Sequence, residues 1–182
     1  MNNLVVPEHV LRLKDQYGVI LDASNQYLTT AGWTAVLTAT GTATLTDGSP
    51  PYVNLFTAAD DDEAAIRSSV ESFLFVANRP IVFGAVIRFA QGGTSSANVF
   101  AGVMDAIAAN AMQAAGAGPK ATSSHAIFFV EEGQTLWTVE QSIGTSPTTS
   151  QLTAANSLDG VAHTAGSTAY QTLEINIEPR NA

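Results

Sequence analysis

The sequence predicts an all-β protein, a β-sandwich or jelly roll. Three observations lead to this class. About ten short runs rich in β-branched and aromatic residues follow one another closely, and only one segment has a convincing helical pattern. Strands and helices also do not alternate as they do in parallel α/β folds. The length of 182 residues suits one domain with a sizeable core.

Three predicted strands open the β region, at Trp33–Thr38, Thr42–Thr46 and Tyr52–Phe56. Thr40-Gly41 separates the first two, and DGSPP at 47–51 separates the second and third. The two prolines favour a wide loop there over a two-residue hairpin. We assign residues 31–182 to the β-sandwich.

Residues 1–30 differ from the rest because they mix apolar and charged residues with neither a helical nor a strand period. We expect an N-terminal arm, either a short helix or an extended segment. Its apolar side chains have no obvious place in the sandwich pattern. We therefore hypothesise that they contact a neighbouring chain, through Val5, Val6, Leu11 and Leu13.

The middle of the chain predicts core strands. The acidic run Asp60–Glu63 precedes a short strand at Ala64–Ser69. The run FLFVANRPIVFGAVIRFA, from Phe73 to Ala90, then predicts two neighbouring strands joined by a turn at Asn78-Arg79-Pro80.

A further strand is predicted at Asn98–Val103, and the one helix follows it at Asp105–Ala115. This segment is rich in alanine and has an acid at its start. Gly116 comes just past its end, where a helix cap commonly places glycine.

The last third predicts a hairpin, a long polar stretch and a final strand. The hairpin strands are Ala126–Val130 and Thr135–Glu140, with the glycine-containing turn 131–134 between them. Residues 141–169 are nearly all small and polar, so we expect either a functional or a disordered segment. Tyr170–Ile177 alternates apolar and polar residues, as a half-exposed strand does.

Composition excludes several classes of function. The chain has no cysteine, so it has no disulfide framework, thiolate nucleophile or cysteine-based zinc site. Seven scattered Lys and Arg residues in a chain of net charge −9 give no basic face for nucleic acid or an anionic membrane. No run reaches the roughly 18 apolar residues of a membrane span. The start, MNNLVVPEHV, lacks a secretory signal pattern. We expect a soluble protein made in the cytoplasm.

Residues capable of catalysis form no recognised motif. His9, His125 and His163 stand far apart, so surface or core roles are favoured over metal binding. No GxSxG elbow is present for a serine hydrolase. The segment Gly116–Lys120 lacks the spacing of a phosphate loop, and its proline removes a needed N–H donor.

Acidic and aromatic residues give equally weak signals. Asp60–Glu63 lacks the alternating spacing and glycine of a calcium loop, so a solvated loop is favoured. Glu131 and Glu132 are adjacent, and in a strand they would point to opposite faces rather than together at a sugar. Trp33 and Trp137 are either glycan-stacking platforms or, as we favour, core residues. The residues therefore predict no catalytic group, metal or cofactor.

Five segments together resemble a known group. They are AGWTAVLTATGTATLTDG (31–48), FTAADDDEAAIRSSVESFLFVANRPIVFGAVIRFAQ (56–91), NVFAGVMDAIAANAM (98–112), SSHAIFFVEEGQTLWTV (123–139) and AYQTLEINIEP (169–179). Their order resembles the concanavalin A-like jelly roll of structural proteins in tailed-phage virions. The likeness lies in pattern rather than in an invariant motif. It departs at Gly84, where the central strand of that group often carries an acid.

The resemblance implies a capsid decoration (cement) protein that binds the major capsid protein on the virion surface. It also implies a homo-oligomer, for which we expect a trimer, and a binding role rather than an enzymatic one. The alternative is a carbohydrate-binding module of a tail or head fibre. A glycan-cleaving enzyme is a weaker third option, because facing carboxylates are missing.

Overall fold

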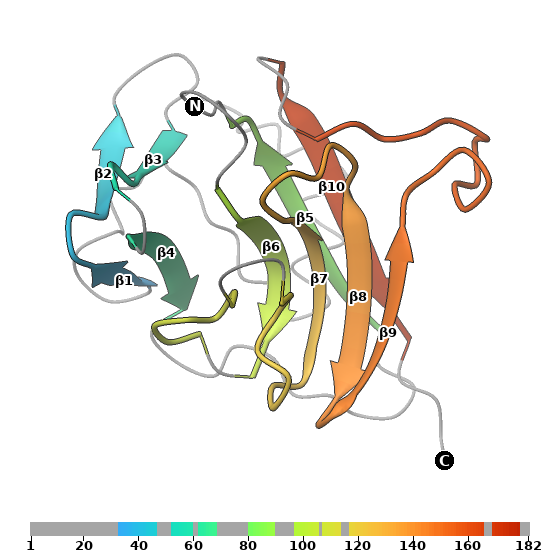
Figure 1. The fold of residues 1–182 in the computed structure, drawn as a ribbon, viewed down its shortest axis with the longest axis horizontal. Helices are drawn as coiled ribbons and strands as arrows, with labels where there is room; N and C mark the ends of the chain where they lie inside the picture. The colour runs from blue at the N-terminus through green and yellow to red at the C-terminus, as the bar shows by residue number, and fades with distance from the viewer. Residues whose placement is uncertain are drawn as a thin grey trace, which may run out of the picture. The chain divides into compact units, whose positions relative to one another are not determined.

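The computed structural model describes residues 33–46, 52–59, 62–68, 80–89, 97–105, 107–113, 117–165 and 169–178. All regular elements within these ranges are antiparallel β-strands (Figure 1). They are β1 (Trp33–Thr38), β2 (Thr42–Thr46), β3 (Tyr52–Phe56), β4 (Glu63–Ser68), β5 (Ile81–Ile87), β6 (Val99–Met104), β7 (His125–Val130), β8 (Thr138–Ile143), β9 (Ser146–Gln151) and β10 (Gln171–Ile177). The all-β prediction is confirmed.

The chain divides into two compact units, Met1–Val76 and Ala77–Ala182, here called unit 1 and unit 2. Within the described residues, the strands pair as three two-stranded sheets and one four-stranded sheet. The predicted arm at 1–30 lies outside the described residues, as does the first strand of the pair predicted in 73–90.

Unit 1 contains two ribbons, β1 with β4 and β2 with β3. The β2–β3 ribbon has two different faces, because opposite residues of an antiparallel pair share a face. One face carries Ala43, Val53 and Leu55. The other is largely exposed and carries threonines, Asn54 and two aromatic rings, Tyr52 and Phe56. No apolar side chain whose burial the structure describes in unit 1 is buried, and the Leu45 side chain lies outside that description.

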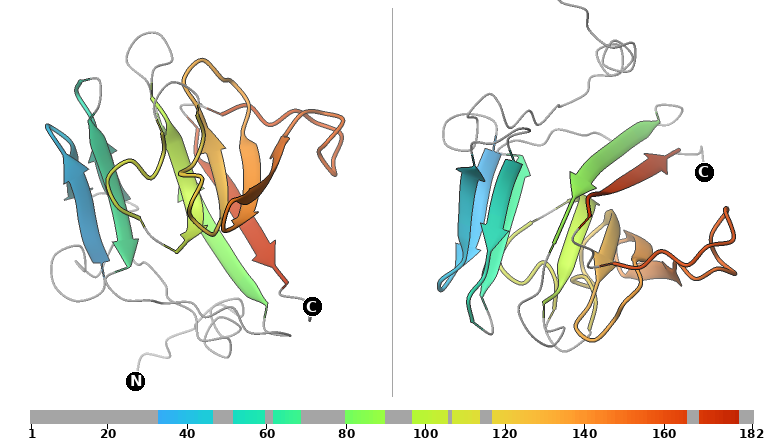
Figure 2. Two further views of the ribbon diagram at one scale, coloured as in Figure 1. Left: turned by 60° about the horizontal axis from the view of Figure 1, so that its bottom comes forward. Right: turned by 90° about the horizontal axis from the view of Figure 1, so that it is seen from above.

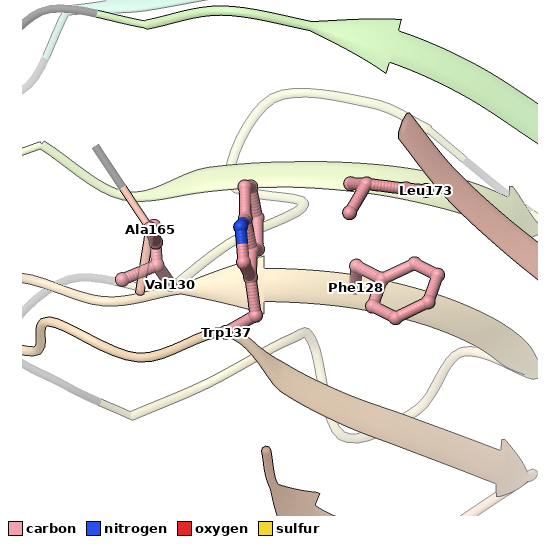
Figure 3. Packing of buried hydrophobic residues seen from close by; sticks show 5 residues of the cluster. All are labelled: Phe128, Val130, Trp137, Ala165 and Leu173. Carbon is pink, nitrogen blue, oxygen red and sulfur yellow. The ribbon is translucent and has the colours of Figure 1, made fainter. Parts of the chain in front are cut away.

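Unit 2 is built on the four-stranded sheet, in the order β6-β7-β8-β9. The β5–β10 ribbon covers one face of it and lies behind the sheet in Figure 1. The core between them contains Phe128, Val130, Trp137, Ala165 and Leu173 (Figure 3). Phe89 meets the Trp137 ring edge-on, with ring centres 5.9 Å apart.

The other face of the sheet carries a second apolar cluster of Met112, Ile127 and Phe129. Alternate side chains of β7 therefore enter different cores. This two-sided burial accounts for the nearly continuous apolar run AIFFV, which is typical of a strand covered on both faces.

The predicted helix at Asp105–Ala115 is wrong for the residues that the structure describes there, 105 and 107–113. Asn110 has a left-handed φ of 62°, which interrupts a right-handed helix. The Gln113 N–H donates to the Gly118 carbonyl at 2.8 Å, and the Lys120 N–H donates to the Ala111 carbonyl at 3.0 Å. These bonds across the loop place Met112 in the second core, so tertiary contacts outweigh the helical propensity of alanine.

The polar stretch 141–169 contains regular structure instead of only loop. Its first residues extend β8, and β9 pairs with β8 through a two-residue turn in which Gly144 has a φ of 63°. By the alternation of an antiparallel ladder, Pro147 occupies a position whose N–H would point away from β8. Proline therefore removes no ladder bond and blocks further pairing at this edge.

Candidate functional site

Unit 2 contains a chain of buried polar groups, which is its strongest candidate for chemistry. β7 starts with His125, and Glu140 of β8 lies opposite Ile127, so both side chains are on the same face of the sheet. His125 Nε2 lies 3.0 Å from Glu140 Oε1, and His125 Nδ1 lies 2.9 Å from Ser123 Oγ. Thr149 of β9 donates to Glu140 Oε2 at 2.6 Å. The side chain of His125 is only 1% exposed and that of Glu140 10%.

A hydroxyl, an imidazole and a carboxylate in this order resemble the parts of a nucleophilic hydrolase. The hydrogen bonds of Ser123 and His125 do not fit that chemistry. The Ser123 hydroxyl donates to the Lys120 carbonyl at 2.7 Å. His125 Nδ1 is 3.2 Å from the Ser123 carbonyl, which can only accept, so the network assigns a proton to Nδ1. A nitrogen that carries a proton cannot take one from serine. The arrangement fits a structural network that satisfies buried polar groups.

Sequence reasoning missed this chain of contacts, because it follows from strand register. Ser123 and His125 are two residues apart, and Glu140 comes 15 residues later in the next strand. The one signal available was a polar Ser-x-His at the start of an apolar strand.

A small hollow lies beside this network, with a volume of about 140 Å³. The loop between β6 and β7 forms it. Its lining consists of three alanines, two hydroxyl side chains and one charge of each sign: Ala108, Ala109, Ala111, Thr122, Ser123, Asp105 and Lys120.

In unit 1, Asp62 makes a structural contact, whereas Asp60 and Asp61 of the predicted solvated loop lie outside the described residues. The Asp62 carboxylate accepts the backbone N–H groups of Thr40 at 3.2 Å, Ala58 at 3.1 Å and Ala59 at 2.9 Å, and also the Thr40 hydroxyl. These bonds, led by the one from the Thr40 hydroxyl, lower the pKa of Asp62 to about 2. They join the β1–β2 turn to the β3–β4 turn, and they occupy oxygens that a calcium ion would need.

The other predicted acidic pair forms part of a turn. Glu131 is buried and accepts the Gly118 N–H at 2.5 Å and the Gln134 side-chain amide at 3.0 Å. Glu132 is exposed, and Gly133 has a φ of 75°. The hairpin-tip interpretation is confirmed.

The two tryptophans have different environments. Trp137 is 1% exposed, and its indole N–H donates to Gln171 Oε1 at 3.1 Å. The core interpretation is confirmed for Trp137, and a glycan platform at this residue is wrong. Trp33 is half-buried at the start of β1.

The remaining predicted site residues do not come together. Val5, Val6, Leu11 and Leu13 lie outside the described residues, as does His9. His163 is half-buried, and its Nε2 lies 3.3 Å from Asp159 Oδ1. In the part of the chain that the structure describes, no three His, Asp or Glu side chains converge as metal ligands would.

Large apolar side chains remain exposed on both units. In unit 1, Phe56 is 55% exposed, and Leu37, Tyr52 and Leu55 are exposed as well. In unit 2, Ile143 is 88% exposed in the β8–β9 turn, and Leu158 is fully exposed in the loop after β9. Exposed residues of this kind indicate contact surfaces when they lie close together.

Comparisons with family models, with curated proteins and with solved structures return no match to this chain. Among the described residues there is also no helix of the length and apolarity that a membrane crossing requires.

Proposed function

We propose that this chain is a structural protein of a tailed-phage virion, a capsid decoration (cement) protein that binds the major capsid protein. Its sandwich is a concanavalin A-like jelly roll, and its mechanism is binding without turnover. The resemblance of the five segments supports the class of protein. One physical observation supports an assembly role: unit 1 buries no apolar side chain among those whose burial the structure describes.

Two-stranded ribbons are marginal in water unless a further layer covers an apolar face. Unit 1 has two such ribbons and leaves Leu37, Leu55 and Phe56 exposed. Burial stabilises an apolar side chain of this size by about 1.5–3 kcal/mol. A partner that covers these residues therefore stabilises unit 1 and the assembly together, by mass action.

The composition agrees with such a partner surface. The exposed face of β2–β3 carries threonines, Asn54, Tyr52 and Phe56 and no charged residue. Interface cores are similarly depleted in charge and enriched in aromatic residues.

Particle composition tests the proposal directly. Quantitative mass spectrometry of purified virions is expected to find this chain in a simple ratio to the major capsid protein. A few copies per particle would instead indicate a tail or fibre component. In a rebinding assay on capsids that lack the chain, the double variant Tyr52→Asp/Phe56→Asp, with both changes on the exposed face of β2–β3, is expected to lose occupancy. Ile143→Asp, which changes an exposed apolar residue of unit 2, is the matched control and should bind normally.

The second candidate function is carbohydrate binding by a module of a tail or head fibre. A specific observation favours it: Tyr52, Asn54 and Phe56 are alternate residues on one exposed strand face. Aromatic rings stack on sugars, and an amide between them can bond hydroxyls. Glycan-array binding that is lost in Tyr52→Ala and in Phe56→Ala, while capsids remain unbound, would favour this function over cement.

A further inference from the structure

The loop that follows β9 is held in one shape by hydrogen bonds, although its sequence is nearly all small polar residues. Its ends meet where the His163 N–H donates to the Leu152 carbonyl at 3.0 Å. Both ends are also tied to Trp137, which donates its backbone N–H to the His163 carbonyl and accepts that of Leu152. Residues 152–163 therefore form a compact loop with close ends, and it extends away from the sheet in Figures 1 and 2.

The tip of this loop presents Leu158 to solvent in a fixed turn. The Gly160 N–H donates to the Ser157 carbonyl at 3.2 Å, and Asp159 Oδ1 accepts the Val161 N–H at 3.0 Å. The Leu158 side chain is fully exposed. A pre-ordered, fully exposed leucine loses little further backbone entropy when a partner covers it.

The hollow between β6 and β7 has the size and lining that such a side chain needs. An apolar cavity of roughly 150 Å³ can hold a benzene molecule. The hollow of about 140 Å³ therefore has room for the isobutyl group of leucine. Three of its seven lining residues are alanines, whose small side chains leave space for the leucine, and the other four are Asp105, Lys120, Thr122 and Ser123.

The hollow offers a cation to the loop. Asp105 and Lys120 both line it, and Asp105 Oδ2 already accepts the Ser124 N–H at 2.9 Å, so Lys120 is the charge that can pair with Asp159, the residue after Leu158. Asp159 Oδ1 accepts the Val161 N–H at 3.0 Å and lies 3.3 Å from His163 Nε2, so Oδ2 is the oxygen that can face a cation. Only seven of 182 residues are Lys or Arg, so Lys120 is one of few cations that the chain can offer to Asp159.

The two features cannot meet within one copy. The hollow lies in the connection that follows β6, and the loop follows β9, so they belong to opposite edges of the four-stranded sheet. Figures 1 and 2 show the loop and the β6–β7 connection on opposite sides of the sheet in every view. A knob and a hollow at different places on one molecule make a head-to-tail contact, which closes into a ring or extends as a filament.

We infer that copies of this chain associate head to tail, with Leu158 of one copy seated in the alanine-lined hollow of the next and Asp159 facing Lys120. This contact lies within unit 2 and does not depend on the virion role. It can be tested in solution, without capsid protein, so its failure would be distinct from failure of the proposed function.

Sedimentation velocity of the full chain over a concentration series tests the contact. The unmodified chain is expected to associate. Leu158→Asp on the loop and Ala108→Phe in the hollow should each weaken association at least tenfold, since each removes the burial of a leucine. Ile143→Asp, at the β8–β9 turn, is the matched control and should associate like the unmodified chain. Far-ultraviolet circular dichroism and Trp137 emission check that each variant is folded.

A mixing experiment separates head-to-tail association from a symmetric contact. Leu158→Asp keeps an intact hollow, and Ala108→Phe keeps an intact Leu158. An equimolar mixture of the two is therefore expected to form one-to-one dimers, although each variant alone is monomeric. A monomeric unmodified chain, normal association of Leu158→Asp, or a mixture that stays monomeric would each overturn the inference.

Discussion

Gly102→Ala is expected to disrupt the pairing of β6 with β7 and to destabilise unit 2. Gly102 lies opposite Ile127 in the register of this pair. A Cβ added at Gly102 would lie 2.4 Å from the Ala126 carbonyl oxygen and 2.6 Å from the Ile127 Cα. Both atoms are backbone, and the first distance is about 1 Å shorter than ordinary van der Waals contact. The strands would have to separate locally.

The loss of stability in Gly102→Ala depends on whether the atoms that clash with the new Cβ can move. Overpacking a core costs roughly 1–3 kcal/mol when side chains can adjust, and a clash with backbone belongs at the upper end, about 3 kcal/mol. Gly84 provides a matched control, because a Cβ added there meets no atom within 4 Å. Gly84→Ala should stabilise the strand by about 0.5–1 kcal/mol, through the lower conformational entropy of the unfolded chain. The two variants should therefore differ by about 4 kcal/mol.

Urea unfolding followed by tryptophan fluorescence measures this difference. Trp33 and Trp137 are the two tryptophans of the chain, one in each unit, so a Trp33→Phe background reports unit 2 alone. The midpoint should fall for Gly102→Ala and stay level or rise for Gly84→Ala. Equal midpoints for Gly102→Ala and its background would refute the β6–β7 register.

Three further predictions follow from single contacts. Asp62 has a folded pKa of about 2, below its usual 3.8, so the stability that it gives unit 1 is present above pH 3.8 and is lost as the pH falls from 3.8 toward 2. Trp33 emission in a Trp137→Phe background should show an acid transition that Asp62→Asn removes, and an unchanged transition would contradict this. Trp137→Ala should cost about 3–5 kcal/mol in urea unfolding, since it empties the centre of the core; a cost below 1 kcal/mol would place Trp137 outside the core. His125→Leu and Glu140→Leu should each lower the free energy of unfolding by about 3 kcal/mol, because each leaves a buried partner unpaired. The double substitution leaves neither partner unpaired and should cost less than the sum of the two. Additive costs would show that the two side chains do not interact.

The strands could be predicted because their residues carry the pattern in themselves. Trp33–Thr38, Thr42–Thr46 and Tyr52–Phe56 match the observed strands to the residue. Each is a β-branched or aromatic run limited by glycine, proline or aspartate. The final strand also alternates as predicted, with Leu173 buried and its neighbours Thr172 and Glu174 exposed.

The errors lie where partners distant in the sequence decide the structure. Alanines in 105–115 favour a helix locally, but Met112 gains a core position and the loop gains cross-chain bonds when the helix is absent. The second strand of the hairpin begins at Thr138, three residues later than predicted, because residues 135–137 bond to 163–165 instead. The local sequence around these residues gives no sign of such contacts.

The candidate sites were still less predictable. Ser123, His125 and Glu140 meet only because β7 and β8 pair in one register. A shift of one residue would turn Glu140 to the opposite face. The loop at 152–163 has the composition of a disordered segment, and it is ordered by backbone hydrogen bonds that any residue other than proline can donate.

The contrast between the two units is the feature that most constrains function. All apolar side chains that the structure describes as buried belong to unit 2, which has a core on each face of β7. The described residues of unit 1 are joined by the two strand ladders and by the bonds to Asp62, a carboxylate near the surface. The described ribbons of unit 1 leave Leu37, Leu55 and Phe56 exposed, so they gain stability from a partner that covers these side chains. We therefore expect unit 1 to be more stable in the assembled particle than in the isolated chain, whereas the stability of unit 2 should change little on assembly.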